Sequence, residues 1–240
     1  MPMVRKLERR AQLAEQDRDA LLALPHHRRH FATGVHLVRD GDRADHCCLL
    51  LSGFAYRHKI TGEGGRQVLS LHLPGDFVDL QNCLLDVSDH NVQMLTDGEV
   101  ALIPREAIRD LAIARPAVGV AMWIDTLVDS AIFREWVVNV GRRDARTRVA
   151  HILCEFSLRL EEAGLAENHR YELPMTQEQL ADAVGLTSVH VNRVLRQLGE
   201  EGLISRKKRA VLIEDWPRMR EVGDFNERYL HRQAAVAGAS

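Results

Sequence analysis

The chain has 240 residues, of which 45% are hydrophobic and 28% are charged. This composition is typical of a globular protein and excludes a disordered or fibrous chain. The 32 Lys and Arg residues are balanced by 34 Asp and Glu residues, so the net charge is −2 and any basic nucleic-acid-binding surface must be local. The length suits one large domain or two of about 100–150 residues.

Four cysteines are scattered along the chain, at Cys47, Cys48, Cys83 and Cys154. None forms a C-x-x-C pair, which disfavours a zinc or iron–sulfur site, and so few thiols suit a reducing cytosol. The N-terminus lacks the apolar stretch of a signal peptide, and no run of about 18 apolar residues would span a membrane. The sequence therefore predicts a cytoplasmic protein without a membrane partner.

Residues 5–24 carry apolar side chains at loosely helical spacing, and Pro25 ends the pattern. From Gly34 to Pro104, short apolar runs alternate with turn sequences such as Asp40-Gly41-Asp42. Many short strands at a spacing of about 8–12 residues predict a β-roll or β-barrel. The apolar runs are Val35–Val38, Cys47–Leu51, Val68–Leu73 and Val100–Ile103.

A long helix is predicted over residues 116–141, because apolar residues recur at helical spacing without an interrupting Gly or Pro after Gly119. Its length of about 37 Å exceeds what one small β-domain covers. We favour packing against a second copy of the chain, with Val128 and Ile132 at the seam, which makes the protein a homodimer. The alternative is a helix that lies across the chain's own second domain.

The segment from Met175 to Glu214 carries the strongest functional signal. Thr176-Gln-Glu-Gln179 forms a capping box, Gly185 suits a left-handed turn, and Thr187 or Ser188 caps a second helix. Two short helices joined by a turn with glycine match the DNA-binding helix-turn-helix. The inner face of the second helix is expected to contain Val191, Val194, Leu195 and Leu198.

A basic hairpin is predicted after this second helix. Strands Leu203–Ser205 and Ala210–Ile213 flank the tip Arg206–Arg209, as in the wing of a winged helix. Six Lys or Arg residues and two Asp or Glu residues between Ser188 and Arg209 give a local charge of +4, which suits phosphate contact. The candidate DNA-binding residues are Ser188, Val189, His190, Asn192, Arg193, Arg196, Arg206, Lys207, Lys208 and Arg209.

Three features in the right order resemble the Crp/Fnr family of bacterial transcription regulators: a β-roll segment, the long helix at 116–141 in the place of the family's dimerisation helix, and a helix-turn-helix. The stretch LADAVGLTSVHVNRVLRQLGEEGLIS resembles the family's helix-turn-helix, and residues 34–77, with their D-G-D, S-G and P-G-D-F turns, resemble its cyclic-nucleotide-binding-type β-roll. The resemblance implies an α+β fold with a β-roll of the double-stranded β-helix or jelly-roll type. It implies a β-roll sensor domain with an N-terminal helix at 1–115, a dimerisation helix at 116–141 and a winged-helix DNA-binding domain at 142–240.

The cyclic AMP pocket that the resemblance implies is altered in this chain. By an ungapped count from Phe77, Leu80 replaces a Glu that holds the ribose, and His90-Asn91 replace an Arg-Ser pair that holds the phosphate. Leucine accepts no hydrogen bond, and histidine is a weaker phosphate clamp than arginine. Asp79 could substitute if the register shifts by one residue. These four residues are pocket candidates for an unknown ligand; cyclic AMP dependence is not expected, nor is an iron–sulfur cluster, since the cysteine cluster of oxygen-sensing members is missing.

The resemblance implies a homodimeric regulator that binds a near-palindromic site in double-stranded DNA and contacts RNA polymerase. Arg193 is the expected base-contacting residue, because arginine to guanine is the commonest specific contact. A rival hypothesis is a ligand-sensing signalling module whose winged helix mediates protein contacts; the exposed Asn192 and Arg193 disfavour it. An enzyme with a regulatory β-roll is disfavoured because no catalytic motif occurs, so neither catalytic nor metal residues are predicted.

Three other groups admit a functional and a structural interpretation. His26-His27-x-x-His30 could hold a metal, but a solvated turn is favoured. His46-Cys47-Cys48 could sense redox state or bind haem, but small apolar side chains on opposite faces of a strand are favoured. Four arginines could touch phosphate or lie on a solvated face, with neither favoured: Arg142, Arg143, Arg146 and Arg148.

Overall fold

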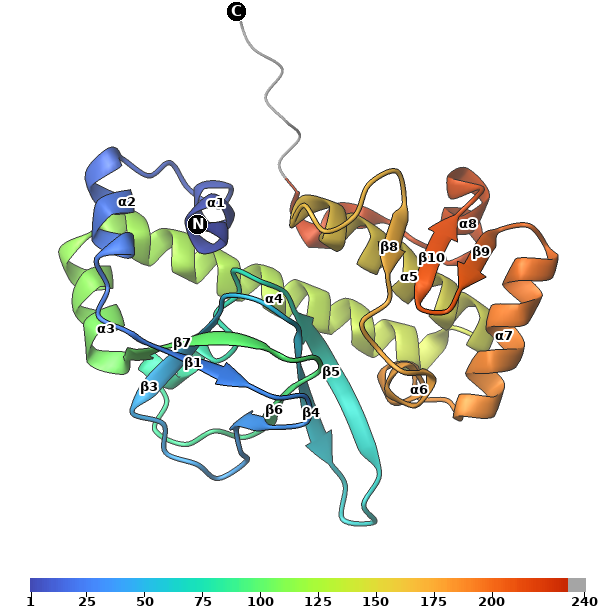
Figure 1. Cartoon of the computed structure of the whole chain (residues 1–240), viewed down its shortest axis with the longest axis horizontal. Helices are drawn as coiled ribbons and strands as arrows, with labels where there is room; N and C mark the ends of the chain where they lie inside the picture. Colours follow the sequence, from blue (N-terminus) through green and yellow to red (C-terminus); the bar gives the residue numbers. More distant parts are fainter. Residues whose placement is uncertain (233–240) are drawn as a thin grey trace, which may run out of the picture. The chain divides into compact units, whose positions relative to one another are not determined.

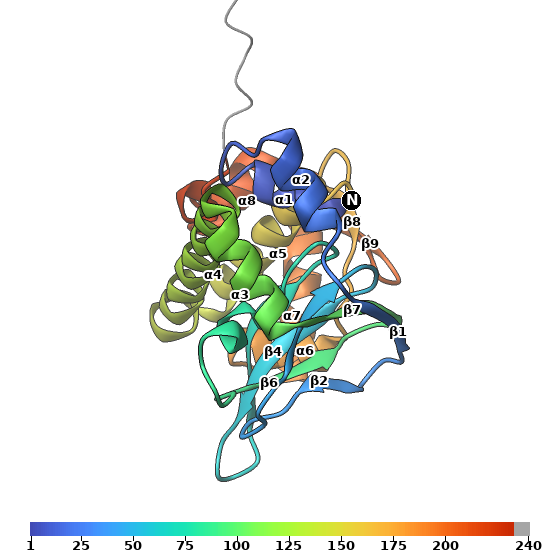
Figure 2. The same cartoon turned by 90° about the vertical axis from the view of Figure 1, so that its left-hand side faces the viewer.

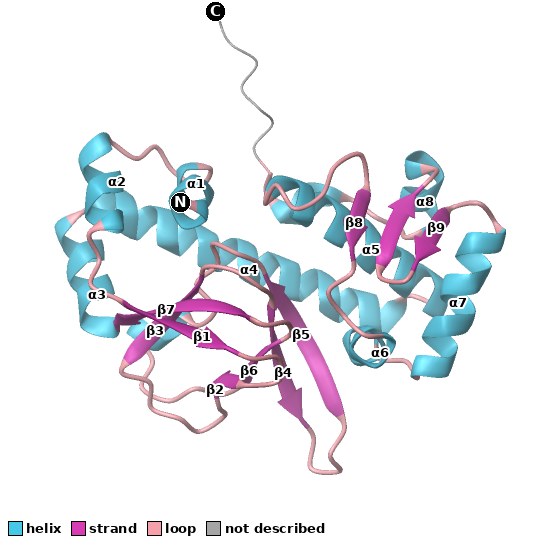
Figure 3. Ribbon diagram, in the orientation of Figure 1, coloured by secondary structure: helices cyan, strands magenta, loops and turns pink. Residues whose placement is uncertain are grey.

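The computed structural model describes residues 1–232, which form a mixed fold of helices and strands (Figures 1 and 3). The α+β class expected from the sequence is confirmed. Residues 233–240, at the end of the expected 142–240 domain, lie outside the described part. The chain divides into two compact units: unit 1 contains Met1–Arg57, His72–Phe133 and Glu227–Ser240, and unit 2 contains His58–Leu71 and Arg134–Asn226.

Two antiparallel sheets form the β-roll. One has the order β1 (His27–Phe31), β7 (Gly98–Pro104), β3 (His46–Leu50), and the other has the order β2 (His36–Val38), β6 (Asn91–Met94), β4 (Ala55–Ile60), β5 (Arg66–His72). Strand β7 is central in its sheet, since Leu102 pairs with His27 of β1 and with Cys48 of β3. The His-rich segment is therefore a strand, and the expected turn is wrong, although residues 27–30 are solvent-exposed as expected.

Strand β3 has an apolar core on both of its faces. Cys47 packs with Leu49 and Ile103 in one cluster, which also contains Met3 and Leu7 of the N-terminal helix. Cys48 packs in a second cluster, whose other members include Leu50, Val78, Val92 and Val100. The two adjacent thiols therefore face opposite sides of the strand, as the alternation of side chains along a strand requires.

Two of the turn sequences meet backbone to backbone and fix the end of the roll. A Cβ on Gly53 would lie 2.5 Å from the carbonyl oxygen of Asp97, and one on Gly98 would overlap the carbonyl oxygen of Ser52. Only glycine allows so close an approach at both positions. The S-G and D-G turns in the sequence therefore mark a contact as well as two changes of direction.

Helices gather beside the strands in unit 1 (Figure 2). They are α1 (Pro2–Glu8), α2 (Glu15–Leu22), η1 (Leu80–Cys83), α3 (Arg105–Ala114) and η2 (Glu227–Leu230). The single helical pattern expected over residues 5–24 is wrong, because it divides into α1 and α2. A new helix begins where the Asp17 carboxylate accepts a hydrogen bond from the backbone N–H of Ala14 at 3.1 Å.

The long helix α4 (Pro116–Arg142) has 27 residues and confirms the predicted element. Its Asp125 forms an ion pair of 2.7 Å with Lys6, and its Asp129 forms one of 2.9 Å with Arg57. Among the described residues, α4 is the one helix long and apolar enough to cross a bilayer by length and composition alone. Helices that pack in a protein core pass the same test, and the two buried ion pairs show that one face of α4 packs in this way.

Unit 2 is built around helix α5 (Ala145–Glu162). The helix begins where Asp144 accepts a hydrogen bond from the backbone N–H of Thr147 at 2.8 Å, and Val149, Ile152 and Phe156 are fully buried along it. After α5 come β8 (Arg170–Glu172), α6 (Gln177–Val184), α7 (Ser188–Glu200), β9 (Ile204–Lys207), β10 (Ala210–Ile213) and α8 (Trp216–Val222). No strand is predicted from the sequence at the position of β8.

Candidate nucleic-acid interface

Helix α6 begins at the predicted capping box. The Thr176 hydroxyl accepts a hydrogen bond from the backbone N–H of Gln179 at 3.2 Å, and the Gln179 side chain accepts one from the backbone N–H of Thr176 at 2.8 Å. Both bonds satisfy backbone donors that a helix start leaves unpaired. This pattern in the sequence therefore fixed the first residue of the helix.

Helix α6 ends at Gly185, whose φ of +64° is the left-handed conformation expected there. The Arg148 guanidinium of α5 donates to the carbonyl oxygen of Val184 at 3.1 Å and to that of Gly185 at 3.5 Å. These carbonyls lie at a helix end, where the helix itself has no backbone N–H groups left to donate to them. Arg148 therefore helps to set the turn between α6 and α7.

Helix α7 is capped by Thr187, whose hydroxyl accepts a hydrogen bond from the backbone N–H of His190 at 3.3 Å. This resolves the choice between Thr187 and Ser188. The expected inner face of the helix is confirmed, because all four of its predicted residues are buried: Val191, Val194, Leu195 and Leu198. The opposite face is thereby left to solvent.

The outer face of α7 holds the expected base-contacting side chains. Ser188, Val189, Asn192 and Arg193 are exposed, while His190 is half-buried. Val189 has 79% of its surface exposed, so its methyl groups are accessible to a ligand on this face.

The two arginines on this face, Arg193 and Arg196, differ in their contacts. Within residues 1–232, Arg193 has no hydrogen bond or ion pair, so its guanidinium is available to a ligand. Arg196 lies 3.8 Å from Glu200, in an exposed ion pair of adjacent helical turns. An exposed pair of this kind holds its partners weakly, so Arg196 can exchange Glu200 for a phosphate.

The wing is a three-stranded antiparallel sheet in the order β8, β10, β9. The predicted second strand, Ala210–Ile213, is confirmed, but β9 runs to Lys207 rather than ending at Ser205. The tip of the hairpin is therefore Lys208 and Arg209, not the four residues expected. Lys208 has a φ of +56°, a conformation that glycine adopts far more readily than lysine.

The expected wing cations lie on different faces of this sheet. Arg206 pairs with Val211, which pairs with Tyr171 on β8, and both of these neighbours are buried. Burial lowers the pKa of Arg206. Lys207 follows Arg206 on β9 and pairs with Ala210. Because successive side chains of a strand point to opposite faces, Lys207 lies on the other face of the sheet, which we call the outer face.

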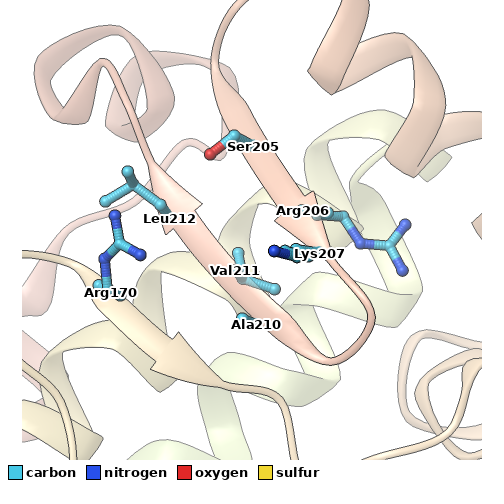
Figure 4. A pocket seen from close by; sticks show the side chains of 7 residues that line it. All are labelled: Arg170, Ser205, Arg206, Lys207, Ala210, Val211 and Leu212. Atoms are coloured by element: carbon cyan, nitrogen blue, oxygen red, sulfur yellow. The ribbon is translucent and has the colours of Figure 1, made fainter.

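A hollow of about 230 Å³ lies beside strands β9 and β10, and Figure 4 shows the side chains around it. It is lined by Arg170 of β8 and by residues of the hairpin: Ser205, Arg206, Lys207, Ala210, Val211 and Leu212. Arg170 is exposed and adds a cation that the sequence analysis missed, because three residues of β8 gave no recognisable strand pattern. The outer face of the wing can therefore contact a polyanion through two cations from different strands.

Three of the four arginines at the junction of α4 and α5 form ion pairs or hydrogen bonds within unit 2. Arg143 forms ion pairs with Glu135 at 2.6 Å and with Asp224 at 3.0 Å. Arg146 pairs with Glu201, and Arg148 caps α6 as described above. The interpretation as phosphate contacts is thereby weakened for all but Arg142.

The first two pocket candidates of the β-roll lie at the start of η1. Asp79 is completely buried and accepts a hydrogen bond from the backbone N–H of Cys48 at 2.8 Å. Burial raises the pKa of Asp79 to about 6, although that hydrogen bond opposes the shift. Leu80 is half-buried and packs against the core cluster that contains Cys47.

The other two candidates lie at the start of β6. The structure brings His90 to η1, because its Nε2 atom lies 3.2 Å from Nε2 of Gln81. The Nδ1 atom of His90 lies 2.7 Å from the Asp89 carboxylate. The side-chain oxygen of Asn91 accepts a hydrogen bond from the backbone N–H of Asp40 at 3.2 Å. Both ring nitrogens of His90 and the side-chain oxygen of Asn91 are therefore already paired within unit 1.

A buried cation near this region was missed by the sequence analysis. Arg57 of β4 donates to the Asp129 carboxylate at 2.9 Å and to the carbonyl oxygen of Val78 at 2.8 Å. Strand β4 was not among the predicted apolar runs, because polar residues interrupt it. Among residues 1–232, no group of three or more His, Cys, Asp and Glu side chains could hold a metal ion.

Comparison with known proteins agrees with this arrangement. Residues 28–114 match the family model of the cyclic nucleotide-binding domain, and residues 147–222 match that of the Crp-like helix-turn-helix domain. The transcriptional activator protein FnrL of Cereibacter sphaeroides is 29% identical over 228 residues, which cover 92% of this chain and 91% of that protein. The nitrogen fixation regulation protein FixK of Azorhizobium caulinodans is 25% identical over 193 residues, covering 80% and 77%.

Solved structures show the same fold. FixK2 from Bradyrhizobium japonicum matches with a TM-score of 0.76 at 24% identity, covering 83% of this chain and 98% of that chain. The c-di-GMP responsive regulator CLP from Xanthomonas campestris matches with a TM-score of 0.68 at 20% identity, covering 84% and 100%. At these identities the comparison supports the fold alone.

Proposed function

We propose, from the membership of this chain in the Crp/Fnr family of DNA-binding transcription regulators, that it acts as a homodimer on a near-palindromic DNA site. The observation that carries the proposal is the outer face of α7, where Arg193 has no partner in the described chain and Val189 is exposed. The second helix of a helix-turn-helix places such side chains against base edges in the major groove of DNA.

A stripe of exposed apolar residues on α4 supports the homodimer. Val120, Trp123 and Leu127 are exposed at successive steps of three and four residues, and the exposed Val137 continues the same register ten residues later, after Ser130 and Arg134. This is the spacing of a two-helix seam. The seam positions expected from the sequence are wrong: Val128 and Ile132 are only 4% and 6% exposed and belong to the chain's own core.

The readout of the half-site follows from the residues on α7. The Arg193 guanidinium can donate two hydrogen bonds to O6 and N7 of one guanine. Val189, one helical turn earlier, carries no acceptor for a cytosine amino group, but its methyl groups suit the methyl group of thymine. The half-site therefore has a fixed guanine and favours an A·T pair at the position that Val189 reaches.

Cyclic AMP is not the effector in this proposal. Leu80 supplies no acceptor for a ribose hydroxyl. The two ring nitrogens of His90 are paired with Gln81 and Asp89, and the side-chain oxygen of Asn91 is paired with Asp40. Millimolar cyclic AMP should therefore leave the DNA affinity unchanged. Calorimetric detection of cyclic AMP binding at micromolar concentration would overturn this part of the proposal.

The mode of action is proposed as transcription control in the cytoplasm through contact with RNA polymerase. Relatives named as transcriptional activators support it. The rival function, a signalling module whose winged helix binds protein, would leave Arg193 and the cations Arg170 and Lys207 without a role. An enzymatic role has no support in the described site.

Selection of bound sequences from a random DNA pool by the full chain tests the proposal. We expect a two-fold symmetric consensus whose half-site centres lie about 34 Å apart, one helical turn of DNA. An asymmetric consensus, or enrichment without a fixed guanine, would contradict the homodimer or the role of Arg193, respectively. The Arg193→Ala variant is the matched control and should lose the guanine while keeping the symmetry.

A further inference from the structure

We propose that Cys47 and Cys83 form a redox-active dithiol that a hydroperoxide converts to an intrachain disulfide. The two Sγ atoms lie 3.0 Å apart, although the residues come from strand β3 and from the end of η1. An Sγ–Sγ bond is about 2.05 Å long, so bond formation requires a movement of only about 1 Å.

The two thiols differ in their surroundings. Cys47 has no exposed surface and packs inside the apolar cluster of Leu7, Leu49 and Ile103. Cys83 is 5% exposed and ends η1, beside a loop that is itself in solvent at Leu84. A small oxidant can therefore reach Cys83 before Cys47.

The hydrogen bond between the two sulfurs favours a thiolate at Cys83. It lowers the pKa of Cys83, and the guanidinium groups of Arg105 and Arg109 on α3 act in the same direction, whereas burial and the Asp79 carboxylate oppose the shift. The same hydrogen bond and burial raise the pKa of Cys47, which keeps its proton. The Nε–H of Arg105 is buried and has no hydrogen-bond acceptor among the described residues, so it can turn toward an anion here.

The chemistry follows from this asymmetry. The Cys83 thiolate attacks one oxygen of the hydroperoxide, the O–O bond breaks, and hydroxide leaves with Cys83 as a sulfenic acid. The Cys47 sulfur then attacks the sulfenic sulfur and an S–S bond forms. The S–O bond breaks, and the hydroxyl group leaves as water with the Cys47 proton. With hydrogen peroxide, two thiols and one peroxide yield one disulfide and two waters.

The remaining cysteines provide internal controls. All four cysteines are free and buried in the structure. Cys48 faces the second core cluster, on the other side of β3 from Cys47. Cys154 lies on α5 in unit 2, where burial raises the pKa of its thiol. Neither should react at a rate comparable to that of Cys83.

The test is oxidation of the full chain with a small molar excess of hydrogen peroxide, followed by alkylation under denaturing conditions. We expect two of the four thiols to escape alkylation, a mass loss of two hydrogens, and a proteolytic fragment pair that joins Cys47 to Cys83 and separates on reduction. Alkylation of all four thiols, or a link that includes Cys48 or Cys154, would overturn the proposal.

Variants separate this chemistry from general oxidation. Cys154→Ser should form the same linked pair as the natural chain, whereas Cys83→Ser should form none and keep three alkylatable thiols. If Cys83→Ser does not fold, the fragment map of the natural chain still decides the question. Accumulation of sulfinic acid at Cys83 without a link to Cys47 would show that the two sulfurs do not meet, and would contradict the proposal.

Discussion

The guanidinium of Arg148 donates to the carbonyl oxygen of Val184 at 3.1 Å, and so joins α5 to the last turn of α6. The next residue, Gly185, turns the chain into the helix that carries Arg193. Arg148, which the sequence analysis considered as a possible phosphate contact, therefore positions the turn before α7.

Replacement of Arg148 by methionine should loosen this turn while keeping the apolar stem of the side chain. We expect a loss of about 1–2 kcal/mol in the free energy of unfolding, because the carbonyl oxygens of Arg143, Val184 and Gly185 lose a donor. DNA affinity should fall in parallel. Arg142→Met removes an exposed arginine nearby and should leave stability within about 0.5 kcal/mol. Equal effects of the two substitutions, measured by urea denaturation, would contradict the role of Arg148.

The proposed seam on α4 is tested by two adjacent positions. Leu127→Glu places a charge on the exposed stripe and should yield a folded monomer, whereas Val128→Glu places one in the core and should unfold the protein. Sedimentation and circular dichroism distinguish the two results. A folded dimer for Leu127→Glu would show that the exposed apolar stripe on α4 is not the dimer interface.

The contrast between these neighbours shows what the sequence could and could not predict. Periodicity placed α4 almost to the residue, but it could not say which apolar face was already covered, because that depends on α1 and the β-roll folding against it. Short polar strands were also missed. Strand β1 is rich in His and Arg and exposed along most of its length, so it has no apolar alternation to detect.

The helix-turn-helix was predicted far better than the β-roll, and the reason is local. Its capping box, its left-handed Gly185 and the inner face of α7 are each set by residues within a few positions of one another. The pairings of Arg57, Arg148 and Cys83 join residues far apart in the chain. No spacing in the sequence could have predicted them.

One substitution at the strained tip of the wing should affect stability and DNA binding in different ways. Lys208→Gly should relieve the positive φ and leave the free energy of unfolding unchanged or higher by up to about 1 kcal/mol. The same substitution removes a phosphate contact, so the DNA affinity should fall equally for all sequences and the salt slope should decrease by about one. A variant with reduced stability and unchanged salt slope would show that Lys208 has a structural role only.

Buried Asp79 should give the protein an unusual pH dependence. Its pKa is raised from 3.8 to about 6, so between these pH values the folded chain holds a proton that the unfolded chain releases. This contribution lowers the free energy of unfolding as the pH rises through that window, by at most about 3 kcal/mol. Asp79→Asn keeps the acceptor for the Cys48 N–H and removes the proton, so it should gain stability relative to the natural chain from pH 4 to 7.

The control for this effect is Asp97, whose pKa is lowered by hydrogen bonds from the backbone N–H and the hydroxyl of Thr33. A lowered pKa has the opposite sign, so Asp97→Asn should lose stability relative to the natural chain as the pH rises. Denaturation curves at four pH values suffice. If the Asp79→Asn variant and the natural chain change in parallel with pH, the carboxyl of Asp79 does not titrate as described.

The central claim, that α7 reads bases while the wing holds phosphates, is tested most directly by comparing Arg193→Ala with Lys207→Ala on two DNAs. Filter binding would measure the affinity of each variant for the selected site and for random-sequence DNA over a range of salt concentrations. We predict that Arg193→Ala loses roughly 1–3 kcal/mol on the selected site and almost nothing on random DNA. Lys207→Ala should weaken both to the same extent and lower the salt slope by about one. Equal losses on both DNAs for Arg193→Ala would contradict base readout by this helix.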